Sequence, residues 1–279
     1  MIVHLNGLVE MVNMRGGIQN GGFAPHVRRL IGWYSFELSL HLAARSNCSS
    51  RTDLHVASAL SSKPRFPPLG IPLTEAPDST SIHFPTDPHT SDFPTSYQFL
   101  SIDETLAHIR TLSSTMSILR KQSVLPEENI WYSDKIYSLQ HQLYFILHNS
   151  PSPSLLDPAM CIAALIFCAV CLRDITFNFR IIYNGVKRLK TALQVFLDRH
   201  WKLSVDYALG VKLFWVLGMG GIASEGKEER SWFVRKFKIM CGVLNLKTWE
   251  GARGLLEEVL WQEDLNGFGR KLWLESRCI

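Results

Sequence analysis

Six cysteines are the first residues in this chain whose type and spacing could do chemistry. Cys168 and Cys171 have the C-x2-C spacing of half a zinc site, and Cys161 lies just upstream. A closed structural zinc site needs four ligands, and the sequence contains no second such pair. All three cysteines fall in one apolar run, so we predict small buried hydrophobic side chains rather than metal ligands or disulfides.

A second chemical candidate is the glycine-rich segment at residues 217–224, which contains Gly218, Gly220 and Gly221. A phosphate cradle would need a preceding strand, a following helix, and either a Lys-Ser/Thr pair or a later acidic residue. Here a helical pattern precedes the glycines and no Gly-Lys-Ser/Thr follows. We therefore predict a turn between two helices.

The most basic helical segment runs from residue 227 to residue 238, with Lys227 and Arg230 at one end and Arg235 and Lys238 at the other. Glu228 and Glu229 leave it nearly balanced, and the net charge of +4 is mild for a nucleic-acid-binding chain. The segment is predicted to be a solvated face, without direct DNA contact.

No residues are predicted to be catalytic, metal-binding, cofactor-binding or nucleic-acid-binding, and the residues that would contact a ligand are unknown. The ten histidines form no two-histidine spacing on a shared helical face, and the sequence contains no serine nucleophile elbow. The chain is therefore predicted not to be an enzyme. An enzyme with a helical active-site cavity is an alternative that rests only on the histidine count.

The hydrophobic periodicity predicts an all-α protein, a multi-helix orthogonal array with one long flexible insertion. Ser101 and Glu104 form a capping box, Asp157 and Pro158 form a second helix start, and Thr248 caps a late helix. Helices are expected at about 2–15, 25–43, 102–119, 133–148, 158–172, 180–199, 205–217 and 227–244, after Thr248, and around Leu272.

The first helix carries Leu5, Leu8, Val9 and Val12 on one face and ends at residues 15–17. No capping residue can precede its start, so we expect the chain to begin inside a larger architecture.

Residues 44–97 are rich in Ser, Thr, Pro and Asp, and eight of the thirteen prolines fall between Pro64 and Pro94. This composition predicts a disordered insertion, with residues 1–43 and 98–279 forming one helical domain.

The longest apolar run covers residues 159–172, fourteen residues, short of the ~20 that a membrane-spanning helix needs. We predict a central core helix and no membrane partner. Six of the eight tryptophans lie between residues 201 and 273, and core anchoring, about one per helix, is the predicted role. They are Trp201, Trp215, Trp232, Trp249, Trp261 and Trp273.

Several segments resemble the regulatory domain of fungal-specific transcription factors. Residues 4–17 (HLNGLVEMVNMRGG) are similar to its "histidine, apolar helix, Arg-Gly-Gly" segment, residues 27–33 (VRRLIGW) to its next helix, and residues 64–67 (PRFP) to the proline motif that follows. Near the other end, residues 214–223 (FWVLGMGGIA) and 230–233 (RSWF) resemble a late helix pair of the family.

The resemblance implies a nuclear regulator whose helical domain lies C-terminal to a binuclear zinc cluster. That cluster needs C-x2-C-x6-C and a similar second half, with two zinc ions sharing six thiolates. Cysteines at 48, 161, 168, 171, 241 and 278 cannot supply it; around Cys161 the two spacings even occur in reversed order. No cofactor is therefore expected in this chain.

The resulting hypothesis is the regulatory or effector domain of an RNA polymerase II-dependent transcription regulator, truncated or naturally lacking its DNA-binding module. Its expected partners are proteins of the transcription machinery or a homodimer partner, with a small-molecule effector between helices as a further candidate. The alternative is a cytosolic helical scaffold or ligand-binding protein derived from such a domain.

Overall fold

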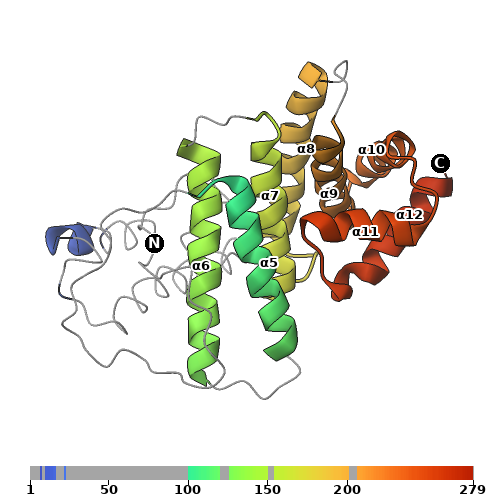
Figure 1. The fold of residues 1–279 in the computed structure, drawn as a ribbon. Helices are drawn as coiled ribbons and strands as arrows, with labels where there is room; N and C mark the ends of the chain where they lie inside the picture. Colours follow the sequence, from blue (N-terminus) through green and yellow to red (C-terminus); the bar gives the residue numbers. More distant parts are fainter. Residues whose placement is uncertain are drawn as a thin grey trace.

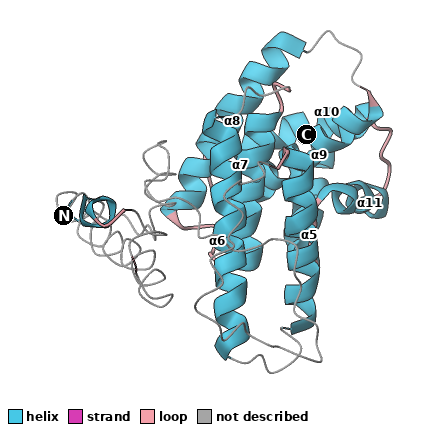
Figure 2. Cartoon of the chain, turned by 60° about the vertical axis from the view of Figure 1, so that its left-hand side comes forward, coloured by secondary structure: helices cyan, strands magenta, loops and turns pink. Residues whose placement is uncertain are grey.

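The computed structural model describes residues 10–16, 100–119, 126–149, 154–200 and 206–278, together with Gly7 and Gly22. This described part is 81% helical and contains no strand (Figure 2). The prediction of an all-α fold is confirmed. None of its helices is both long enough and apolar enough to cross a membrane. The helix predicted at 25–43 and the insertion predicted at 44–97 lie outside the described residues.

Two groups of helices make up this part of the chain (Figure 1). In the first group α5, α6, α7 and α8 lie lengthwise beside one another, and in the second α10, α11 and α12 surround α9. Their bounds are α5 Ile102–Leu119, α6 Pro126–Asn149, α7 Asp157–Phe167, α8 Arg180–His200, α9 Tyr207–Ala223, α10 Arg230–Val243, α11 Trp249–Val259 and α12 Asn266–Cys278. One hydrophobic core runs through both groups, because α7 packs on α5, α6, α8 and α9.

The N-terminal segment is helical at residues 10–14 and turns at Arg15 and Gly16. Gly16 has a φ of 87°, the left-handed conformation that glycine adopts at helix ends. The predicted stop of the first helix is therefore confirmed, and Val12 on its apolar face is buried. The earlier part of the predicted helix lies outside the described residues, apart from Gly7.

The apolar run becomes α7 and a short π-helix at Cys168–Leu172. The backbone N–H of Arg173 donates to the carbonyl of Cys168 at 3.1 Å, the five-residue spacing of a π-turn. Cys161, Phe167 and Cys168 are completely buried. The predicted central core helix is confirmed, but it is α-helical only as far as Phe167.

The glycine-rich segment is not a turn, so that prediction was wrong. α9 continues as one helix through Gly218, Gly220 and Gly221 to Ala223, and the chain turns at Gly226, whose φ is 70°. Helix propensity alone would favour a break here, since each glycine disfavours a helix by about 1 kcal/mol. Packing decides instead, because every residue of α9 from Leu213 to Ala223 is buried.

Gly218, Gly220 and Gly221 each receive a side chain from a different helix. A Cβ at Gly218 would lie 2.9 Å from Leu256 of α11, and a Cβ at Gly221 would lie 2.5 Å from Leu272 of α12. A Cβ at Gly220 would overlap the ring of Phe233 of α10, with Cδ1 and Cζ both 2.7 Å away. The missing side chains let three helices approach the α9 backbone, so these glycines are the hub of the second group.

The tryptophans are core residues to different degrees. Trp215 of α9 is completely buried, and its indole N–H donates to the carbonyl of Leu260 just after α11. Trp273 is also buried. Trp232, Trp249 and Trp261 are only half-buried, and Trp201 lies outside the described residues. Core anchoring is thus confirmed for Trp215 and Trp273, and in part for the other three.

Candidate functional site

One cleft with both apolar and charged lining lies where four helix ends meet, and we call it the helix-end cleft. It is formed by the starts of α5, α7 and α9 and by the end of α6, and its volume is about 420 Å³. That is enough space for a small molecule. Its lining residues are Leu100, Ser101, Ile102, Asp103, Ile146, Ser154, Leu156, Asp157, Met160, Asp206, Ala208, Leu209 and Lys212.

The first wall of the helix-end cleft is fixed by the capping box at the start of α5. The Ser101 backbone N–H donates to Glu104 Oε2 at 2.7 Å, and the Glu104 backbone N–H donates to Ser101 Oγ at 3.3 Å. The predicted capping box is confirmed. Because the Ser101 N–H stabilises the carboxylate, the pKa of Glu104 is below its usual value.

A second wall is the start of α9, where Asp206 is the N-cap. Its Oδ1 accepts the Leu209 backbone N–H at 2.7 Å. Lys212, one turn further along, spans the cleft to both carboxylate oxygens of Asp103, at 2.7 and 2.8 Å. Asp103 is exposed and Lys212 is partly exposed, so this ion pair contributes little to stability and a polar ligand could displace it.

The third wall, at the start of α7, differs from the sequence prediction. Asp157 is the first helical residue rather than the cap, and it is buried. Leu156 occupies the cap position and makes no side-chain cap bond; its own backbone N–H donates to Ser154 Oγ at 3.2 Å. The predicted cap failed because Ser154 starts a turn before Asp157. Pro158 lies in the first turn of the helix, as predicted.

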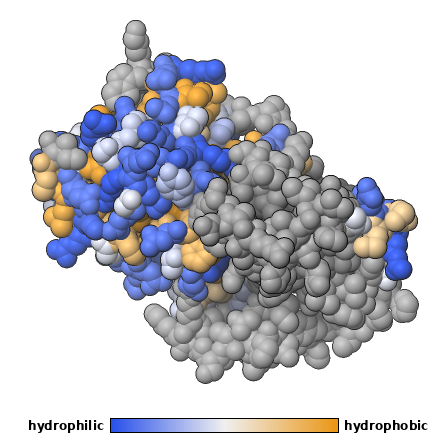
Figure 3. Space-filling view, turned by 180° about the vertical axis from the view of Figure 1, so that it is seen from behind, coloured by the Kyte–Doolittle hydropathy of each residue, from blue (hydrophilic) through white to orange (hydrophobic). Residues whose placement is uncertain are grey.

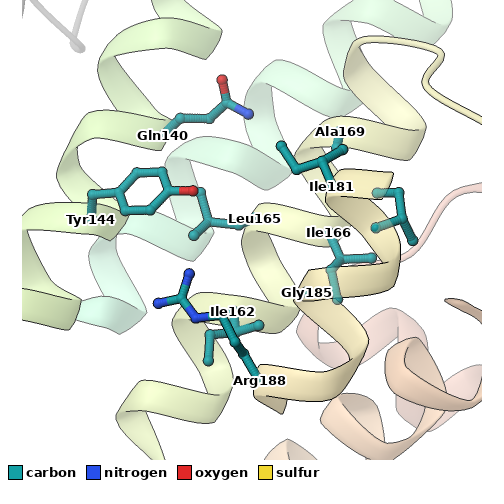
Figure 4. A pocket seen from close by; sticks show the side chains of 10 residues that line it. Gln140, Tyr144, Ile162, Leu165, Ile166, Ala169, Ile181, Gly185 and Arg188 are labelled. Atoms are coloured by element: carbon teal, nitrogen blue, oxygen red, sulfur yellow. The ribbon is translucent and has the colours of Figure 1, made fainter. Parts of the chain in front are cut away.

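A second, much smaller cavity lies between α6, α7 and α8 (Figure 4). Its volume is about 30 Å³, room for a water molecule rather than for a ligand. Tyr144 points from α6 toward Leu165, and the guanidinium of Arg188 reaches up from α8. Gln140 accepts from the Arg173 Nε–H at 3.1 Å, which links α6 to the end of the π-helix. Both α6 and α8 pack on α7 around this cavity.

Cys161, Cys168 and Cys171 are small buried side chains, as the sequence predicts. Burial raises the pKa of the Cys168 thiol to about 12 and also raises that of Cys161. Within the described residues no three His, Cys, Asp or Glu side chains gather closely enough to hold a metal ion. A thiol whose pKa is raised in this way is mostly protonated at neutral pH and is therefore a weak nucleophile.

The basic segment is only partly the solvated face that was predicted. Lys227 donates to the carbonyls of Ala223 and Phe177 at 2.8 and 3.0 Å, and burial lowers its pKa. Arg230 donates from Nε to Glu275 of α12 at 2.8 Å, and it also bonds to the Gly221 carbonyl. α10 therefore begins at Arg230 rather than at residue 227, because the residues before it form the turn that joins α9 to α10 and α12.

No residue of the helix-end cleft is predicted from the sequence to be a ligand contact. Asp206 before an apolar run is a recognisable cap signal. Nothing in the sequence shows that Asp103 and Lys212, 109 positions apart, meet across a cleft. Comparison of the chain with family models, with curated proteins and with solved structures gives no match. The class that the fold defines is an all-α helical array with a small-molecule-sized cleft at its helix ends.

Proposed function

We propose that this chain is the regulatory domain of a fungal-specific transcription regulator, acting through protein contacts and without a DNA-binding module of its own. The observation that supports this most directly is the position of the segments that resemble the family. Residues 214–223 and 230–233 contribute Trp215, Gly220 and Phe233 to the hub of the second helix group. A resemblance confined to surface positions would have little physical meaning, whereas this one falls on residues that determine the packing.

The helix-end cleft supports a role for a small-molecule effector in this regulation. It touches both helix groups, since α5 and α7 belong to the first and α9 to the second. A ligand that bound better to one arrangement of these helix ends would shift the population toward that arrangement. Helices at the surface of the two groups would transmit this change in arrangement to a protein partner.

A reporter experiment tests the proposal. The full chain is fused to an unrelated DNA-binding domain and expressed in a fungal cell with a matching reporter gene. We expect the fusion to raise or lower transcription, and a fluorescent fusion of the chain alone to accumulate in the nucleus. A folded, abundant fusion that leaves the reporter unchanged would contradict the proposal, as would exclusion of the chain from the nucleus.

The second candidate function is a cytosolic helical scaffold or ligand-binding protein, and the volume of the helix-end cleft favours it. In that case the fluorescent fusion stays outside the nucleus and the reporter does not respond. A thermal-shift screen of small molecules would then identify a ligand, and Lys212→Ala should reduce the shift. Lys271→Ala serves as the control, because it removes an exposed ion pair, with Glu225, outside the cleft.

A further inference from the structure

We propose that the outer face of α10 binds an acidic amphipathic helix of a protein partner. We define this face as Trp232, Arg235, Lys238, Ile239 and Val243. It lies opposite the buried side of the helix, which packs on α9 and α12. The inference rests on the proposed function only in taking the chain to act through protein contacts.

The outer face combines apolar and basic side chains in an ordered way. Trp232, Ile239 and Val243 follow one another at helical spacing and form a ridge about 16 Å long, three turns of helix. Ile239 is 38% exposed and Val243 is 63% exposed. Arg235 and Lys238 are exposed along one side of this ridge. Isolated apolar residues are common on protein surfaces, but a ridge bordered by like charges indicates a binding site.

The charge of α10 determines the chemistry of the partner. The helix contains Arg230, Arg235, Lys236 and Lys238 and no acidic residue. Arg230 is paired with Glu275, whereas Arg235 and Lys238 form no ion pair with any described residue. A complementary partner therefore presents carboxylates beside an apolar stripe.

A second copy of the chain does not fit this face. In a twofold dimer the same patch meets itself, so Arg235 and Lys238 would oppose the same cations of the partner. Nucleic acid does not fit well either, since the exposed apolar side chains of Ile239 and Val243 lie beside the two cations. Seen from behind, the surface of the described residues is mainly hydrophilic with small separate hydrophobic patches (Figure 3). A narrow ridge matches one helix rather than a broad membrane contact.

The site is also preorganised. Phe233, Phe237 and Met240 hold the buried side of α10 in the core, and Phe237 stacks on Phe214 of α9 with ring centroids 4.7 Å apart. A partner helix would meet a surface that does not have to fold first, and this lowers the entropic cost of binding.

The test is a binding titration with the purified full chain and a defined probe. The probe is a labelled 20-residue peptide with Leu at i, i+3, i+4 and i+7 and Glu on both sides of that stripe, and the reference is a scrambled peptide of the same composition. We expect the amphipathic peptide to bind at least about tenfold more tightly than the scrambled one, by fluorescence anisotropy. Higher salt should weaken the binding without abolishing it.

Charge reversal separates this face from the rest of the surface. Arg235→Glu/Lys238→Glu should weaken peptide binding about tenfold, because two attractive contacts become repulsive. Arg199→Glu/Arg270→Glu is the matched control: it changes net charge equally at exposed positions on α8 and α12, and affinity should stay within about twofold. Ile239→Asn/Val243→Asn should remove the binding that persists at high salt.

Four results would overturn the proposal. The first two are binding of the scrambled peptide as tight as that of the amphipathic peptide, and unchanged affinity after charge reversal at Arg235 and Lys238. The third is tighter binding of duplex DNA or phosphatidylserine vesicles than of the peptide. The fourth is self-association of the chain that the same charge reversal abolishes. Failure here is distinguishable from failure of the proposed function. Peptide binding without a reporter response would overturn only the proposed function, and a reporter response without peptide binding would overturn only this inference.

Discussion

The replacement of Gly220 by alanine tests the glycine hub of α9. In an ordinary helix this change is favourable, since alanine has about 1 kcal/mol better helix propensity than glycine. Here the new Cβ would overlap the completely buried ring of Phe233. Three ring atoms lie within 2.7 Å of the Cβ position, well inside ordinary van der Waals contact.

The overlap outweighs the gain in propensity. Overpacking a closed core costs roughly 1–3 kcal/mol, and an overlap with three ring atoms belongs at the upper end of that range. The Phe233 ring has little room to retreat, because it packs edge-on against Trp232 with centroids 4.9 Å apart. Subtracting the propensity gain, we expect Gly220→Ala to lower the free energy of unfolding by about 2 kcal/mol.

Urea unfolding followed by circular dichroism measures this loss, which should also lower Tm by about 4–8 °C in a chain of this size. Gly254→Ala is the matched control, because Gly254 lies within α11 with nothing near its Cβ position. The control should be neutral or more stable, by up to about 1 kcal/mol. The same chemical change therefore has opposite effects at the two positions.

Alanine at position 220 would also be unfavourable if the glycine were needed for a turn. A double variant distinguishes that explanation from close packing. Gly220→Ala/Phe233→Leu should be less destabilised than the sum of the two single changes, because leucine frees the space that the new methyl needs. If the two changes are strictly additive, Gly220 does not contact Phe233 in the way described. If Gly220→Ala is as stable as the original chain, the hub itself is refuted.

Three further predictions concern the cap of α5, the buried indole and the thiols. The pKa of Glu104 is lower in the folded chain than in the unfolded chain, so its bond to Ser101 stabilises the fold at pH values above the unfolded pKa. This stabilisation is lost as the pH falls through the folded pKa. The loss of unfolding free energy caused by Glu104→Gln, measured in urea, should therefore become smaller below about pH 4. Trp215→Phe leaves the buried Leu260 carbonyl without its donor and should lower the free energy of unfolding by about 1–3 kcal/mol, so an unchanged urea midpoint would count against this bond. In the native chain, iodoacetamide should label the exposed Cys278 but not the buried Cys168, and peptide mass spectrometry would measure the labelling. Equal labelling of both thiols would contradict the burial of Cys168.

Features governed by neighbouring residues were predictable from the sequence. The capping box of Ser101 and Glu104 and the cap at Thr248, which accepts the Gly251 N–H at 3.2 Å, are where the sequence predicts them. Such caps connect residues three apart, so the pattern contains the whole interaction. The all-α class follows from the same local periodicity.

Features that depend on distant residues were not predictable. Glycine at position 220 disfavours a helix locally, and only the arrival of Phe233 from α10 makes it the fitting residue. Lys227 has the sequence pattern of a solvated cation, but its ammonium group donates a hydrogen bond to the Phe177 carbonyl, 50 positions away. The helix-end cleft is a still stronger case, because its four helix ends converge only through the tertiary packing.

The glycine hub also determines how a partner on α10 could act. Phe233 joins the buried side of α10 to the α9 backbone at Gly220, so α10 cannot slide along α9 without driving that ring into the helix. Closely packed interiors resist such small displacements. A helix bound to the outer face would therefore meet a fixed platform, and binding would recruit the partner rather than rearrange the domain. Gly220→Ala should accordingly weaken peptide binding through loss of the platform, while Gly254→Ala leaves it intact.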